Sequence, residues 1–142
     1  MNARALADYA AYFERVAPET LDELPALLAA DARFRDPFND ARGLEAIRRV
    51  FERMFETCAE VRFRVHDQAL SAAAGYLLWT MTFRPRARGM GRRPWRIEGM
   101  SRVRFDAAGK IVEHIDYWDA GSQFYARLPL LGGLIRWIAR RV

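Results

Sequence analysis

Cysteine, histidine and long apolar runs are scarce in this chain of 142 residues. Its one cysteine, Cys58, excludes a disulfide framework, and its two histidines fall short of a metal-ligand pattern. No apolar run reaches the roughly 20 residues that a membrane-spanning helix needs. Asp8 interrupts the first residues, where a signal peptide would be continuously apolar. We therefore expect no metal and a cytoplasmic protein in which Cys58 is a buried small residue.

The composition that is present is that of a folded domain. Hydrophobic residues make up 51% of the chain and aromatic residues 13%, which excludes the disordered class. The net charge of +5 invites a nucleic-acid interpretation, but the basic residues are scattered, and their one dense cluster lies at 84–93. Two glycines and a proline in that cluster predict a hairpin loop instead of a recognition helix. A solvated loop is favoured over a phosphate site, and no nucleic-acid partner is expected.

The periodicity of apolar residues predicts helices first and strands afterwards, which makes an α+β domain. The strands should form a curved antiparallel sheet wrapped over the N-terminal helices. No repeat or linker divides the chain, so we expect a single domain over 1–142, with 129–142 as a helical extension. Helices are expected at 3–16, 20–28 and 44–58, strands at 31–38, 61–65, 76–83, 97–105 and 110–118, and loops at 39–43 and 106–109.

Two carboxylates stand among large apolar neighbours at the ends of predicted strands. Asp36 lies in the segment 34–38, and Asp116 lies in the segment 109–119. A buried acid is costly unless it is hydrogen-bonded or used in chemistry. Asp36 precedes Pro37, so it is either a turn acid that caps backbone amides or a catalytic or ligand-binding group.

The strand around Asp116 places its alternate residues on one face. His114, Asp116 and Trp118 share this face, because side chains two apart in a strand point the same way. If the face lines a pocket, His114 and Asp116 form a coupled acid and base. The other interpretation is a structural hydrogen-bond pair. His66 alternates outward with arginines and is expected in solvent.

These features together resemble a known superfamily. The order of elements, the strand that ends in Asp36-Pro37, and above all Gly109-Lys110-Ile111 before the last strand are similar to the ketosteroid isomerase-like fold. This superfamily includes the SnoaL-like polyketide cyclases, limonene epoxide hydrolases and nuclear transport factor two. The resemblance covers roughly residues 5–128. It implies a conical barrel with an apolar pocket at its open end, a fold that serves enzymes and binding modules alike.

The resemblance also implies roles for individual residues. Asp36 matches the general base of the isomerases, and Tyr12, which lies 24 residues earlier, matches their oxyanion-hole tyrosine. Ser101 replaces a protonated aspartic acid of the isomerases, and a hydroxyl is a weaker proton donor.

The end of the chain is closer to the limonene epoxide hydrolases. Asp116 matches an acid of those enzymes, and Asp119 lies nearer the rim. Met81 and Phe83 occupy the places of their Arg-x-Asp pair, and Asp36 replaces their water-holding asparagine. Epoxide hydrolysis is therefore disfavoured.

The favoured activity is isomerisation or cyclisation by proton transfer next to a carbonyl, without a cofactor. Asp36 or Asp116 would remove the proton, and Tyr12, Ser101 or His114 would hydrogen-bond the enolate oxygen. An apolar substrate of steroid, polyketide or terpenoid size is expected. The alternative is a non-catalytic binding or assembly module. The predicted pocket residues are Phe34, Phe38, Trp79, Met81, Phe83 and Trp118.

Two surfaces point to contacts outside the pocket. Tyr76, Leu78 and Met100 lie among arginines on the outer face of the predicted sheet, a mixture typical of interfaces, so we expect a homodimer. The tail beyond Pro129 predicts a short helix with a wide apolar surface and arginines at its end. We expect Trp137 to be buried on the pocket mouth or on a partner subunit, with an anionic membrane as the alternative site of contact.

Overall fold

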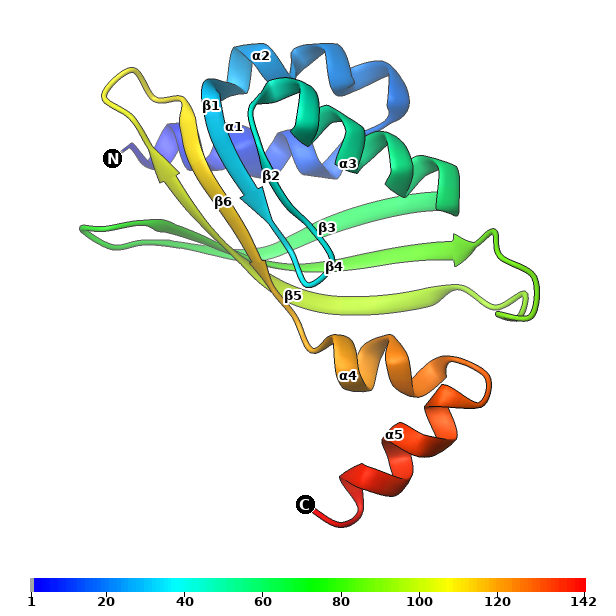
Figure 1. Cartoon of the computed structure of the whole chain (residues 1–142). Coiled ribbons are helices and arrows are strands. Elements are labelled where there is room, and N and C mark those ends of the chain that lie inside the picture. Colours follow the sequence, from blue (N-terminus) through cyan, green and yellow to red (C-terminus); the bar gives the residue numbers. More distant parts are fainter. Residues whose placement is uncertain (1) are drawn as a thin grey trace.

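One curved sheet organises the structure, a computed structural model that describes residues 2–142 (Figure 1). Its order is β2-β1-β6-β5-β4-β3, and all neighbouring pairs are antiparallel except β1 and β6, which are parallel. The sheet stays open, with β2 and β3 at its edges. The strands are β1 (Leu28–Arg35), β2 (Asp40–Arg42), β3 (Cys58–Leu70), β4 (Gly75–Pro85), β5 (Trp95–Phe105) and β6 (Ile111–Tyr117).

The helices lie at two ends of the sheet. The first helices and α3 gather over one end of its concave face, while the last helices follow β6 at the other end (Figure 1). The helical segments are α1 (Ala3–Glu14), the 3₁₀ helix η1 (Pro18–Glu23), α2 (Leu24–Leu27), α3 (Leu44–Thr57), α4 (Ala120–Gln123), the 3₁₀ helix η2 (Tyr125–Arg127) and α5 (Leu131–Ala139). This architecture confirms the predicted α+β class and the curved sheet over N-terminal helices.

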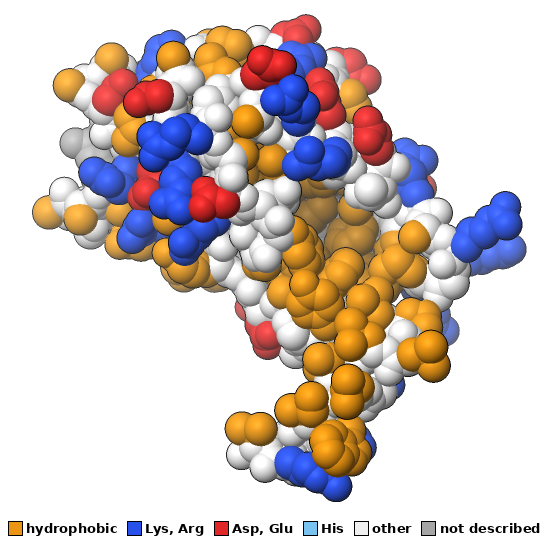
Figure 2. All heavy atoms as spheres, in the orientation of Figure 1, with side chains coloured by type: hydrophobic (Ala, Val, Ile, Leu, Met, Phe, Trp, Pro, Cys, Tyr) orange, Lys and Arg blue, Asp and Glu red, His pale blue; other side chains and the backbone are white. Residues whose placement is uncertain are grey.

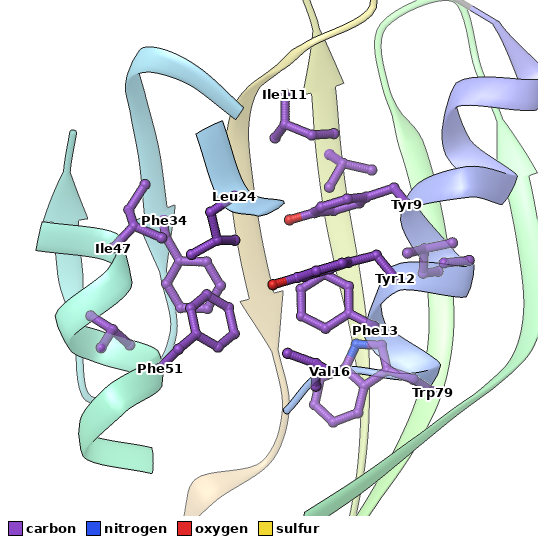
Figure 3. Close-up of a cluster of buried hydrophobic side chains, with 14 of the residues drawn as sticks. Tyr9, Tyr12, Phe13, Val16, Leu24, Phe34, Ile47, Phe51, Trp79 and Ile111 are labelled. Carbon is purple, nitrogen blue, oxygen red and sulfur yellow. The ribbon is translucent and has the colours of Figure 1, made fainter. Parts of the chain in front are cut away.

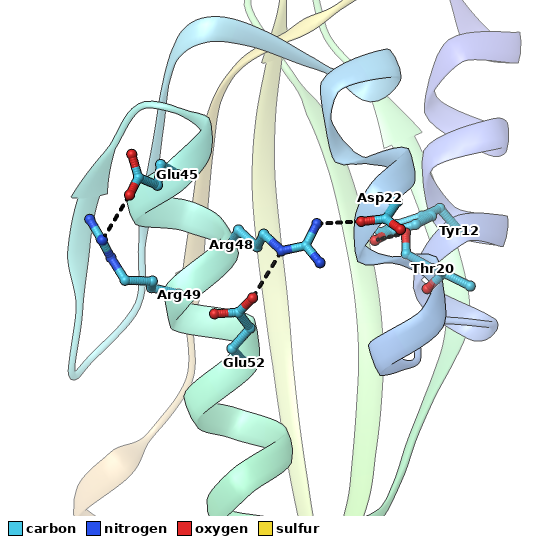
Figure 4. A network of polar contacts seen from close by, with 7 residues as sticks. All are labelled: Tyr12, Thr20, Asp22, Glu45, Arg48, Arg49 and Glu52. Carbon is cyan, nitrogen blue, oxygen red and sulfur yellow. Dashed lines mark hydrogen bonds and ion pairs between the residues drawn. The ribbon is translucent and has the colours of Figure 1, made fainter.

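The core forms where α1, α2 and α3 pack on the sheet (Figure 3). Alternation in β5 is nearly perfect, since its inward residues are buried and its outward residues are mostly exposed. The α1 helix contributes Leu6, Tyr9 and Phe13 to this core, as its apolar stripe predicts. In the first half of α3, Arg48 forms ion pairs with Asp22 of η1, at 2.6 Å, and with Glu52 (Figure 4).

Two local predictions are wrong. Thr20 does not open the second helix, because η1 begins at Pro18 and the Thr20 hydroxyl accepts a hydrogen bond from the Ala17 amide at 2.9 Å. Residues 40–42 form β2, not a loop, and pair with β1. An ion pair of 2.6 Å between Arg33 and Asp40 spans these two strands, and a loop signal does not register that long-range pairing.

The tail forms a helix after Pro129 as predicted, but this helix does not pack on the pocket mouth of its own chain. Trp137 is 47% exposed and is absent from the residues that line the cavity described below. The expectation that Trp137 closes the pocket mouth within its own chain is therefore wrong. The physical reason is the direction of α5, which extends away from the sheet (Figure 1). Within residues 2–142 we find no helix with both the length and the apolar character needed to cross a membrane.

Candidate functional site

A cavity of about 470 Å³ opens between the concave face of the sheet and α3. This volume is in the range of small-molecule sites, roughly 300–1,000 Å³. The cavity opens at the end of the sheet that the N-terminal helices leave uncovered, and the hollow is visible in Figure 2. All six apolar residues predicted for the pocket line it, namely Phe34, Phe38, Trp79, Met81, Phe83 and Trp118.

Asp116 is held in this cavity by one of its two oxygens. Its Oδ1 accepts a hydrogen bond from the Ser101 hydroxyl at 2.5 Å and lies 2.6 Å from Nε2 of His114. The Trp79 indole N–H donates in turn to the Ser101 oxygen at 2.8 Å. The second oxygen of Asp116, Oδ2, has no hydrogen-bond partner among residues 2–142, although the Asp116 side chain is only 16% exposed. One oxygen of Asp116 is thus fixed, and the other has no partner among the described residues, on a side chain that lines the cavity.

His114 connects Asp116 to the core. Its Nδ1 lies 2.8 Å from the hydroxyl of Tyr9, and both residues are buried. Burial raises the pKa of Tyr9 well above its ordinary value, and the negative charge of Asp116 raises this pKa further. The phenol therefore keeps its proton and can donate it to Nδ1. That assignment leaves the proton of a neutral His114 on Nε2, where it donates to the Asp116 carboxylate.

Asp36 also lines the cavity, but its carboxylate is more fully engaged. Its Oδ1 accepts from the backbone amides of Phe38 and Asn39, each at 2.8 Å. The Asn39 side-chain amide approaches both oxygens, at 3.0 and 3.1 Å. Burial raises the pKa of Asp36, these hydrogen bonds offset part of the rise, and the charge of Asp116 adds to it. Asp36 therefore combines the turn role and the pocket position that the sequence left as alternatives.

Tyr12 does not reach the pocket. It is fully buried on α1, its hydroxyl donates to the Thr20 carbonyl at 3.1 Å, and it is not among the lining residues. The hydroxyl that joins the acid network is that of Tyr9, which the sequence analysis missed. Its signal was its place on the apolar stripe with Leu6 and Phe13, which directs a side chain toward the sheet. Tyr12 was predicted from the number of residues that separate it from Asp36, and this number does not indicate which side of α1 faces the cavity.

Gly99 is the residue that lets the network close. A Cβ at this position would lie 2.6 Å from the Trp79 ring and 3.0 Å from the Trp118 Cβ. Gly99 pairs with Trp79 across β4 and β5, two residues from Ser101. The absent side chain thus gives Trp79 the room from which its indole reaches the serine.

The remaining polar lining contains no metal-binding group. Among residues 2–142 no three His, Cys, Asp or Glu side chains gather in a way that holds a metal ion. Cys58 is a free, half-buried thiol on the cavity wall, and burial raises its pKa, so it stays protonated. His66 is exposed, as expected, and bonds Thr80 at 2.8 Å on the outer side.

Comparison with known proteins identifies the family. The family model of the SnoaL-like domain matches residues 9–114, so the chain belongs to the SnoaL-like domain family. This finding agrees with the resemblance drawn from the sequence. No curated protein matches the chain.

Solved structures agree on the fold. A protein with a ketosteroid isomerase-like fold from Catenulispora acidiphila, in complex with trimethylamine, is similar at a TM-score of 0.72 and 17% identity, over 91% of this chain and 96% of that one. An NTF2-like protein of unknown function from Burkholderia pseudomallei gives 0.69 and 18%, over 94% and 93%. A suspected SnoaL-like polyketide cyclase from Shewanella putrefaciens gives 0.68 and 15%, over 84% and 93%.

Proposed function

We propose that this protein is a cofactor-independent isomerase or cyclase that transfers a proton next to a carbonyl group of an apolar substrate. The observation that carries the proposal is the asymmetric binding of Asp116 in an apolar cavity. One oxygen is fixed by Ser101 and by His114, and the other has no partner within residues 2–142. A carboxylate oriented in this way is suited to act as a general base.

In the proposed reaction, Oδ2 of Asp116 accepts the proton from the carbon next to the substrate carbonyl. The electron pair of that C–H bond moves into the carbonyl group and forms an enolate. Asp36 lies on the wall of the same cavity, and in its protonated form it would donate a hydrogen bond to the developing oxygen. In an isomerisation, the enolate is conjugated with a neighbouring C=C bond of the substrate, and Asp116 returns the proton to the far carbon of that bond, so the double bond shifts and no electrons leave the substrate.

The substrate class follows from the shape and polarity of the cavity. Its wall is mainly aromatic and aliphatic, with Asp36, Ser101, His114 and Asp116 at one region. A volume of about 470 Å³ suits a ligand of steroid, polyketide or terpenoid size. The likeness to a suspected polyketide cyclase supports a carbonyl-bearing compound of this kind.

Exchange of α-protons in D2O tests the activity directly. A panel of cyclic enones is incubated with the protein, and deuterium incorporation is followed by NMR. Asp116→Asn should lower the exchange rate by about 10²–10⁴-fold, the usual contribution of a general base. Asp31→Asn, the same change at an exposed position outside the cavity, should leave it unaltered.

A non-catalytic binding module is the competing function. The engagement of both Asp36 oxygens in a turn is the observation that favours it, because a carboxylate tied by hydrogen bonds need not react. If the enones bind but none exchanges faster than in buffer, the binding module is the correct interpretation.

We also propose a homodimer in the cytoplasm. On the outer face of the sheet, Met100 is 43% exposed and pairs with Tyr117, which is 50% exposed. Leu78 is the partner of Met100 on the other side, so an apolar patch crosses three strands. The free thiol of Cys58 suits a reducing compartment. Sedimentation at micromolar concentration should give a dimer mass, and Met100→Arg should give a monomer.

A further inference from the structure

The net charge of +5 is distributed unevenly along the chain. The segment 84–96, here called the loop segment, contains six arginines and no acidic residue. The segment 120–142, here called the tail segment, contains four arginines and no acidic residue. The rest of the chain has thirteen basic and eighteen acidic residues, a net charge of −5. The positive charge of the protein is therefore concentrated in two segments.

The tail segment combines this charge with exposed apolar side chains. On α5 and beside it, Leu134 is 52% exposed, Trp137 is 47% exposed and Leu130 is 96% exposed. The guanidinium of Arg141 lies 3.9 Å from the centre of the Trp137 ring. A basic helix that leaves large apolar residues uncovered has the composition of an interfacial helix.

The loop segment brings its charge to the mouth of the cavity. Ala87 and Met90 of this loop line the cavity, while the arginines between and beside them are exposed. Of the ten arginines in the two segments, only Arg84 and Arg96 form ion pairs within residues 2–142. All six arginines of the loop segment are exposed, namely Arg84, Arg86, Arg88, Arg92, Arg93 and Arg96.

An apolar surface connects the cavity to the tail. Phe38 is 49% exposed at the mouth, and its ring packs on Phe124, 5.1 Å between centres. Phe124 lines the cavity and leads through η2 into α5. Figure 2 shows hydrophobic side chains from the hollow down to the tail, with basic side chains at the right edge, where Figure 1 places the loop between β4 and β5.

We propose that this open end docks on an anionic lipid bilayer, through α5 and the loop segment. The apolar side chains of α5 enter the boundary of the acyl chains, and the arginines contact anionic headgroups. The cavity mouth then faces the bilayer, so its ligand is a lipophilic compound that passes directly between membrane and cavity. This last step rests on the proposed function, whereas the docking does not.

Complementarity selects the bilayer over other occupants. A nucleic acid would neutralise the arginines but would leave Leu134 and Trp137 in water. A second copy that covered α5 with its own α5 would bring arginines against arginines, which is unfavourable. An anionic bilayer matches both the charge and the apolar surface.

Sedimentation with vesicles tests the docking on the full chain. Vesicles of phosphatidylcholine with 30% phosphatidylserine should bind the protein at low salt, and vesicles of phosphatidylcholine alone should bind it much more weakly. The triple variant Arg88→Gln, Arg92→Gln, Arg93→Gln should lower the partition coefficient on the order of 100-fold, at roughly fivefold per basic residue. The double variant Arg62→Gln, Arg64→Gln removes two charges from the exposed outer face of β3, and as the control it should change the partition coefficient little.

A second variant separates lipid docking from a protein interface. Leu134→Ser with Trp137→Ser, both at exposed positions, should abolish vesicle binding while circular dichroism and the dimer mass stay unchanged. The proposal is overturned if the wild-type protein does not bind the anionic vesicles, or if this variant binds them equally well. It is also overturned if the variant instead changes the oligomeric mass. Exchange of enone protons without vesicles tests the proposed activity and not the docking, so failure of either proposal is distinguishable.

Discussion

The two ends of the concave sheet face are filled in opposite ways. At the end covered by α1, α2 and α3, Leu6, Leu24 and Ile111 are at most 2% exposed. At the other end, Phe38 is 49% exposed and a cavity of about 470 Å³ remains. The same curved sheet therefore supports a closed core at one end and, toward the other end, a cavity between the sheet and α3. The two parts overlap, because core residues such as Phe51 and Trp79 also line the cavity.

One polar chain crosses from the covered end to the open one. Tyr9 is part of the core, His114 lies between, and Asp116 reaches the cavity. A buried polar group is tolerated because each member has a hydrogen-bond partner. Because these three residues are connected by hydrogen bonds, the position of Asp116 in the cavity depends on the packing of Tyr9 in the core.

Truncation of a side chain at each end should give the largest contrast. Leu24→Ala removes a fully buried side chain and should cost about 2–5 kcal/mol of the free energy of unfolding. Phe38→Ala should cost about 1 kcal/mol, since only edge contacts with aromatic rings are lost. It should, however, weaken the binding of an apolar fluorescent probe. Urea unfolding and probe titration measure the two effects, and equal unfolding costs would remove the distinction between the ends.

Loss of a single hydroxyl tests the connection between the ends. Tyr9→Phe leaves Nδ1 of His114 without a partner and should cost about 1–3 kcal/mol. Because it also frees the His114 ring, it should lower the exchange rate of a substrate enone. Tyr12→Phe removes another hydroxyl of α1, and the one hydrogen bond of this hydroxyl among residues 2–142 is to the Thr20 carbonyl. It should leave exchange unchanged, and an equal loss of exchange in both variants would refute the role of Tyr9.

The smallest effect concerns Asp36 and pH. Because its pKa is raised, the folded protein binds this proton more tightly than the unfolded chain. Its contribution is therefore most favourable below the unfolded pKa of about 3.9 and is lost as pH rises through the folded pKa. Relative to wild type, the free energy of unfolding of Asp36→Asn should increase as the pH rises from 3.5 to 7, by less than about 1 kcal/mol. Thermal melts at both pH values measure the gain, and a difference that is independent of pH would contradict the raised pKa.

Much of the fold and part of the site could be predicted. The alternation of β5 and the stripe of α1 depend on local periodicity, which the chain carries in itself. The shared face of His114, Asp116 and Trp118 follows from the same alternation, and all three line the cavity. The assignment of Tyr12 to the pocket was the error, because the number of residues between Tyr12 and Asp36 does not say which side of the helix faces the sheet, when successive residues are 100° apart.

The α+β class, the family, the main helices and strands, and the apolar residues around the acids could all be inferred from the sequence, since these depend on neighbours along the chain. Only the tertiary structure decided which hydroxyl meets His114, which oxygen of Asp116 is free, and that α5 points away from the cavity. Those contacts join residues far apart in the chain, 105 positions in the case of Tyr9 and His114. Local periodicity gives the face on which a side chain lies, and packing of distant elements decides what that face meets.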